Sequence, residues 1–131
     1  MHRNPGRPLS PHLTIWRWGP HMAVSILNRV TGVGLSVVGA LAFAWWLVAA
    51  ASGPEAYAGF MSVATGWLGI LFAVGLTWAL LTHTAGGIRH YVLDIGAGYE
   101  LRSNRRWSWI TIIGSLVVTA AIWAYILLGA N

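Results

Sequence analysis

Three long apolar runs, separated by short polar or glycine-rich stretches, dominate the pattern of this chain. The first run, residues 30–51, contains no charged side chain, and its length meets the ~20 residues that a helix needs to cross a bilayer. Further runs of the same kind cover residues 56–88 and 107–128. The pattern therefore predicts an all-α membrane protein with three transmembrane helices, at about residues 25–52, 60–94 and 107–129.

The segments around the apolar runs differ in character. Residues 1–24 contain four prolines and the aromatic residues Trp16 and Trp18, and so we expect an irregular or interfacial arm before a membrane anchor of residues 25–131. Residues 52–59 are expected to turn, because they contain glycine and proline. A helix over all of residues 56–88 would be about 50 Å long, so we expect tilt or an interfacial first turn.

Composition supports the membrane assignment and limits the chemistry. The chain is 56% hydrophobic and only 8% charged, which excludes an ordinary soluble domain. It contains no cysteine, so it cannot supply thiolates to an iron–sulfur cluster or attach haem covalently through a C-x-x-C-H motif. Any cofactor must therefore be bound non-covalently.

The net charge of +5 comes with an uneven distribution. All the basic side chains are arginines, and they flank the apolar runs on one predicted side of the membrane: Arg3, Arg7, Arg17, Arg29, Arg89, Arg102, Arg105 and Arg106. This distribution favours a topological signal over nucleic-acid binding. By the positive-inside rule, we expect the N-terminus and the second loop, residues 97–106, in the cytoplasm and the C-terminus outside.

The histidine inside the second apolar run needs a partner, because an ionisable group in a membrane span is costly. His83 shares a helical stripe with Gly87, His90 and Asp94. From the residues alone, His83 could ligate haem iron, form a structural hydrogen bond or relay protons. His90 lies roughly 10 Å further along the helix, too far to hold the same metal ion. No other histidine lies within the apolar runs, so a six-coordinate iron would need a ligand from a partner chain.

Polar residues near the start of the first span offer a second candidate site. Arg29 is either an interfacial anchor or a partner for an anionic or carbonyl group. Ser25 lies one turn earlier on the same face, so the two side chains could offer donors to a quinone head group. Small residues follow at helical spacing and allow the close approach of a helix or a flat ligand: Gly32, Ser36 and Gly39.

The chemistry visible in the rest of the chain is limited. His90 and Asp94, four residues apart, could simply form an ion pair. A nucleophile paired with a base, a carboxylate pair and a phosphate-binding loop are all absent from the sequence. We therefore do not expect this chain to dehydrogenate a substrate by itself.

Three segments, RPLSPHLTIWRW, SILNRVTGVGL and HTAGGIRHYVLDIG, resemble in order and spacing the cytochrome b membrane-anchor subunit of succinate dehydrogenase, respiratory complex II. The resemblance covers essentially the whole chain. It implies a helical bundle formed with a second anchor subunit, alongside a flavoprotein subunit and an iron–sulfur subunit. It further implies electron transfer from the iron–sulfur subunit to ubiquinone in the tricarboxylic acid cycle and respiratory chain.

The resemblance also implies roles for individual residues. His83 matches the axial ligand of haem b, with the opposite ligand supplied by the second anchor subunit. Ser25 and Arg29 match residues of the ubiquinone pocket, and Arg29 and His90 match residues near the haem propionates. The apolar wall of the pocket corresponds to Trp18, Met22 and Ile26. The family usually has histidine where this chain has Asn28, which cannot carry charge or titrate.

Other readings of the sequence remain open. A fumarate reductase anchor would share the fold and run the reaction in the opposite direction. A haemless structural subunit would use His83 only for packing, whereas an ion transporter would need paired acidic residues at mid-membrane, which this sequence lacks. The arm begins directly with family-like residues, so we expect a bacterial inner membrane, with the C-terminus in the periplasm.

Overall fold

The computed structural model describes Gly6 and residues 17–129, and the regular structure within them is helical. The elements are α1 (Pro20–Gly34), the π-helical segment η1 (Leu35–Gly39), α2 (Ala40–Ala51), α3 (Pro54–Ala64), α4 (Trp67–Asp94) and α5 (Leu101–Gly129). Three stretches are long and apolar enough to cross a membrane: Pro20–Ala51, Trp67–Asp94 and Leu101–Gly129. The prediction of an all-α chain with three membrane-spanning helices is confirmed.

The first span begins earlier than the expected residue 25. Gly19 adopts an extended conformation as N-cap and Pro20 occupies the first turn of α1, where a missing backbone N–H costs nothing. Pro20 therefore starts the helix. The other prolines of the expected arm, like its residues His2 and His12, lie outside the described residues.

The second apolar run is divided into two helices. α3 ends at Ala64 and α4 begins at Trp67, with the hydroxyl of Thr65 donating to the Met61 carbonyl at 2.7 Å across the end of α3. The span is therefore α4 alone. Its 28 residues give a length of about 42 Å, closer to the bilayer thickness than the whole run would be.

The third span also begins earlier than expected. The predicted polar loop of residues 97–106 is helical from Leu101 onward, since arginine is a good helix former and the arginines of this turn are exposed. The remaining connection turns sharply at Gly96 and Gly98, whose φ angles of 85° and 79° favour glycine.

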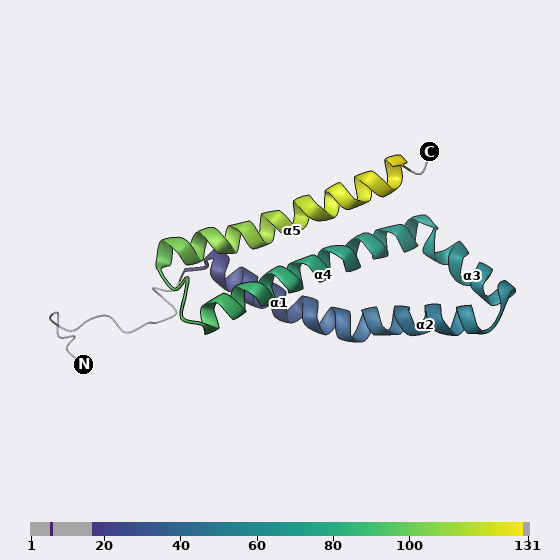
Figure 1. Cartoon of the computed structure of the whole chain (residues 1–131), viewed down its shortest axis with the longest axis horizontal. Helices are drawn as coiled ribbons and strands as arrows, with labels where there is room; N and C mark the ends of the chain where they lie inside the picture. Colours follow the sequence, from purple (N-terminus) through teal and green to yellow (C-terminus); the bar gives the residue numbers. More distant parts are fainter. Residues whose placement is uncertain (1–5, 7–16, 130–131) are drawn as a thin grey trace.

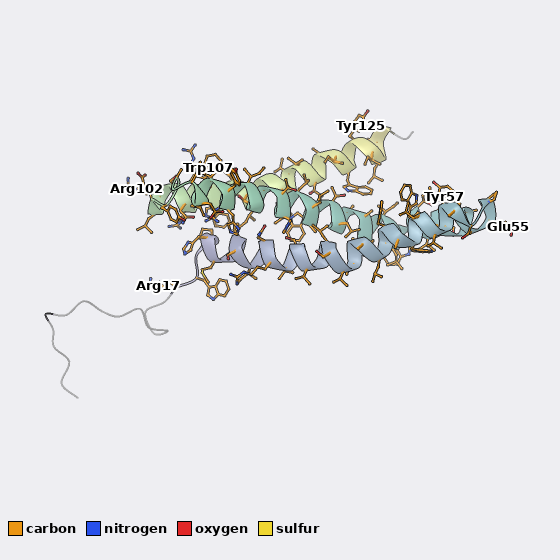
Figure 2. All side chains as sticks on the ribbon, turned by 60° about the horizontal axis from the view of Figure 1, so that its bottom comes forward. Arg17, Glu55, Tyr57, Arg102, Trp107 and Tyr125 are labelled. Carbon is orange, nitrogen blue, oxygen red and sulfur yellow. The ribbon has the colours of Figure 1, made fainter. Side chains whose placement is uncertain are left out.

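Consecutive spans run antiparallel, so that α4 is opposite in direction to α1 and α5, and α1, α4 and α5 are in mutual contact (Figure 1). α2 contacts α3 but makes no contact with α4 or α5, so the helices spread apart beyond η1. The start of α1 and the α4–α5 turn lie at one end of the molecule, opposite the α2–α3 turn. Figure 2 places Arg17 and Arg102 at the first end and Glu55 and Tyr125 at the other.

Small hydroxyl side chains fill the contacts between the helices. The buried polar residues are Thr31, Thr82, Ser108, Thr111, Ser115 and Thr119, whereas Val24 and Ala49 are the buried apolar residues of the described chain. The Thr82 hydroxyl donates to Ser115 Oγ at 3.0 Å, and this bond links α4 to α5. Because small residues allow helix backbones to approach closely, this packing is typical of membrane helices. The large apolar side chains point outward, where lipid or partner subunits would cover them.

Candidate functional site at the α1–α4 contact

His83 lies on the side of α4 that faces α1. Its Nδ1 atom is 2.9 Å from the backbone carbonyl oxygen of Asn28. A carbonyl oxygen can only accept a hydrogen bond, so the neutral imidazole must carry its proton on Nδ1. The lone pair is then on Nε2, which leaves that nitrogen able to bind a metal ion.

Two glycines allow α1 and α4 to make this contact. An added Cβ at Gly32 would lie 2.8 Å from Cε1 of His83, so the imidazole rests directly on the α1 backbone. In the reverse direction, an added Cβ at Gly86 would lie 2.5 Å from Oδ1 of Asn28. Each helix thus places a polar side chain over a glycine of the other.

The Asn28 side chain has an unusual environment. Its Oδ1 atom is buried and has no hydrogen-bond partner, although the backbone carbonyl of the same residue is bonded to His83. A buried unsatisfied acceptor costs about 1–3 kcal/mol. The resemblance leads us to expect histidine at this position. The asparagine found here instead has a buried side-chain oxygen without a hydrogen-bond partner.

The surface of α4 beside His83 is open at one glycine. Gly87, one turn further along α4, is exposed, and an added Cβ there would meet nothing within 4 Å. Bare helix backbone is therefore accessible beside an imidazole whose Nδ1 is already bonded. From the sequence alone, a structural hydrogen bond and haem ligation are alternative roles of His83. The two roles are compatible, because the hydrogen bond uses Nδ1 and ligation would use Nε2.

The predicted quinone residues lie on another side of α1. Val24 is buried, and Asn28 on the same stripe faces α4. Ser25 and Arg29 are rotated from that stripe by about 100°. Ser25 is half-buried and Arg29 is exposed. The remaining members of the predicted pocket are half-buried or exposed: Trp18, Met22 and Ile26. This face is open in the single chain, so any pocket there would need walls from other subunits.

The other predicted residues of the stripe, His90 and Asp94, do not interact with each other. Both belong to the described chain, within which no ion pair joins them, so the simple ion-pair interpretation is not supported. His90 is half-buried and Arg29 is exposed, and no hydrogen bond between these two described residues brings them together. The neighbouring Arg89 instead donates through Nη2 to Oδ1 of Asn104, which ties α4 to α5.

Sequence reasoning missed the partner of His83. The Asn28 carbonyl is a backbone group, and no side-chain pattern marks it as a hydrogen-bond acceptor. The sequence identified Gly32 as one of several small residues at helical spacing, but it did not predict contact with the imidazole. That contact can be predicted only when the position of α4 along α1 is known.

The fold and the site together define a multi-pass membrane protein with a histidine available for ligation between two of its spans. A model of the family described as "Succinate dehydrogenase/Fumarate reductase transmembrane subunit" matches residues 3–122. The chain belongs to this family.

Several curated relatives are similar over most of this chain. The succinate dehydrogenase cytochrome b556 subunit of Paracoccus denitrificans is 41% identical over 112 residues, covering 86% of this chain and 85% of the relative. The cytochrome b556 subunit of Rickettsia typhi is 32% identical and covers 89% of this chain and 90% of the relative. The mitochondrial cytochrome b560 subunit of Homo sapiens is 38% identical, over 72% of this chain and 57% of the relative.

Proposed function

We propose that this chain is the cytochrome b membrane anchor of a bacterial succinate dehydrogenase. In this role it holds the flavoprotein and iron–sulfur subunits at the cytoplasmic face and forms half of the haem and ubiquinone sites with a second anchor subunit. Electrons from succinate pass through the iron–sulfur subunit to quinone. The family match and the names of the relatives support this proposal.

The single observation that carries the haem assignment is the hydrogen bond from His83 Nδ1 to the Asn28 carbonyl. A ligating histidine usually donates its second N–H in this manner, which fixes the tautomer and the ring orientation. His83 would hold haem b through Nε2, and the second axial ligand would come from the partner anchor. When bound, haem b supplies a one-electron centre beside the route to quinone.

For the quinone site, Ser25 and Arg29 on the exposed side of α1 would donate hydrogen bonds to the quinone carbonyls. Donors fixed in advance stabilise the negative charge that develops on those oxygens during reduction. Trp18, Met22 and Ile26 would exclude water from the ring. His90 would contact the haem propionates together with Arg29.

The fumarate reductase anchor is the alternative within the same family, since the family model covers both enzymes. The relatives compared above are succinate dehydrogenase subunits, and this similarity favours succinate oxidation. Retention of His83 points the same way, because a fumarate reductase anchor can lack haem.

A reduced-minus-oxidised optical spectrum of the purified native complex tests the proposal, together with the same spectrum of His83→Ala. We expect a low-spin b-type signal in the native complex and its loss in the variant. The complex should still assemble, which the flavin content would check. Absence of haem from the native complex would refute the haem assignment and leave a haemless anchor.

A further inference from the structure

The contact between His83 and α1 depends on Gly32, which has no side chain. We infer that Gly32 is a positioning residue for His83: it lets the imidazole reach the Asn28 carbonyl, and that bond keeps the proton on Nδ1 and the lone pair on Nε2. This inference rests on the haem ligation proposed above. Gly32 itself does not touch the iron.

The geometry around the imidazole supports this role. An added Cβ at Gly32 would lie 2.8 Å from Cε1 and 3.2 Å from Nδ1 of His83, both closer than ordinary van der Waals contact. The ring would have to move away from α1 to relieve this overlap. Because Nδ1 is 2.9 Å from its acceptor on the same helix, such a movement would break or weaken the hydrogen bond.

The acceptor of the His83 hydrogen bond belongs to the backbone of α1. The Thr31 hydroxyl forms its short bond, 2.6 Å, with the Leu27 carbonyl and lies 3.3 Å from the Asn28 carbonyl. Within α1 the Asn28 oxygen also accepts the helical N–H of Gly32, so the imidazole shares this acceptor and uses one of its two lone pairs. Since the bond uses the backbone of Asn28, it is independent of the side chain at this position. This explains how asparagine can replace the family's histidine without loss of the ligand's orientation.

The first test is Gly32→Ala in the assembled complex, with haem-to-flavin ratio, low-spin electron paramagnetic resonance signal and haem midpoint potential as readouts. Removing an outer partner of a metal ligand typically costs 10–100-fold in affinity. We expect haem affinity to fall by roughly that factor, or the remaining haem to show an altered low-spin signal and potential. An unchanged ratio, signal and potential would overturn the inference.

Two matched glycine variants separate positioning from general packing. Gly34→Ala adds the same methyl group to α1 where nothing lies within 4 Å, so it should match the native complex. Gly86→Ala disturbs the same helix pair by pressing on Asn28 rather than on His83. Haem loss in Gly86→Ala as large as in Gly32→Ala would show that packing alone is responsible, and would overturn the positioning role.

A chemical test remains available if Gly32→Ala fails to assemble. In His83→Gly, added imidazole should restore the low-spin signal, because it can donate to the Asn28 carbonyl while binding iron. 1-Methylimidazole has no N–H and should bind about 10-fold more weakly, whereas 4-methylimidazole controls for the bulk of the methyl group. Equal affinity of the three ligands would overturn the inference, and a native complex without haem would instead refute the proposed haem ligation by His83.

Discussion

At the scale of single residues, His83 illustrates how a polar group is accommodated within a membrane span. The structure satisfies one ring nitrogen through the Asn28 carbonyl and leaves the other available. Because the hydrogen bond occupies Nδ1 alone, the same arrangement is compatible with a structural contact and with the proposed ligation through Nε2.

The sequence identified His83 because it is the lone histidine within the apolar runs, and the cost of burying it required an explanation. It could not identify what His83 contacts. That contact depends on how far α4 is shifted along α1, a quantity set by the summed packing of both helices. The exposed face with Ser25 and Arg29 was predicted as a stripe from helical periodicity alone.

Arg29→Ala tests the proposed quinone site. If Arg29 polarises a quinone carbonyl, its removal should lower the rate of succinate-dependent quinone reduction by on the order of 100-fold. Succinate oxidation with a water-soluble dye should be largely kept, because the flavoprotein and iron–sulfur subunits do not depend on this residue. Both rates are measured on the same purified complex.

The matched control is Arg105→Ala, which removes an exposed positive charge at the same end of the molecule. It should leave both activities near their native values. A parallel decline of quinone and dye activities in Arg29→Ala would indicate failed assembly rather than a missing pocket residue.

At the scale of helices, glycine placement determines where the elements meet and where they end. The pattern predicted three spans correctly, but it did not predict the break between α3 and α4 or the π-helical segment η1. Thr65 and Gly66 are small and uncharged, so hydropathy continues across the break without a signal. The π-helical turn has no sequence mark of its own and depends on the local packing of the first span.

The α3–α4 joint is tight at Gly69. An added Cβ there would overlap the Val63 carbonyl oxygen and lie 2.5 Å from that of Ala64, and both are backbone atoms that cannot move independently. We therefore expect Gly69→Ala to destabilise the protein by about 1–3 kcal/mol, the usual cost of overpacking. Denaturant unfolding of the purified complex, followed by far-ultraviolet circular dichroism, measures this change.

Gly75→Ala is the control for this prediction, since it adds a methyl group to the same helix where nothing lies within 4 Å. It should be neutral or stabilising by up to about 1 kcal/mol, because alanine favours the helix. Equal stability of the two variants would argue that α3 can shift to accommodate a side chain at Gly69.

At the scale of the whole molecule, the chain has almost no apolar core of its own. Within the described residues only Val24 and Ala49 are buried apolar side chains, whereas many large ones are exposed along all three spans. A bilayer can cover such surfaces. The face with Ser25 and Arg29 is open in the single chain, and in the proposed complex other subunits would cover it.

The distribution of arginine sets the expected orientation of this complex. The described arginines lie just before α1 or within it, near the end of α4 and at the start of α5, and none follows Arg106. The start of the first span, the end of α4 and the start of α5 lie at the same end of the bundle. By the positive-inside rule, that end should be cytoplasmic and the α2–α3 turn periplasmic. The iron–sulfur subunit would then meet the same end as Ser25 and Arg29, a short route for electrons.

Because the chain has no cysteine, single substitutions can map this orientation without background labelling. In intact spheroplasts, a membrane-impermeant maleimide should label Glu55→Cys, at the exposed start of α3, and should not label Tyr99→Cys in the α4–α5 turn. Denaturing solubilisation should make both labelled, which controls for a thiol covered by a partner subunit. Labelling of Tyr99→Cys but not Glu55→Cys in intact spheroplasts would place the arginine-rich end outside. The proposed docking of the iron–sulfur subunit at the end of the molecule that carries Ser25 and Arg29 would then be untenable, even if His83 binds haem.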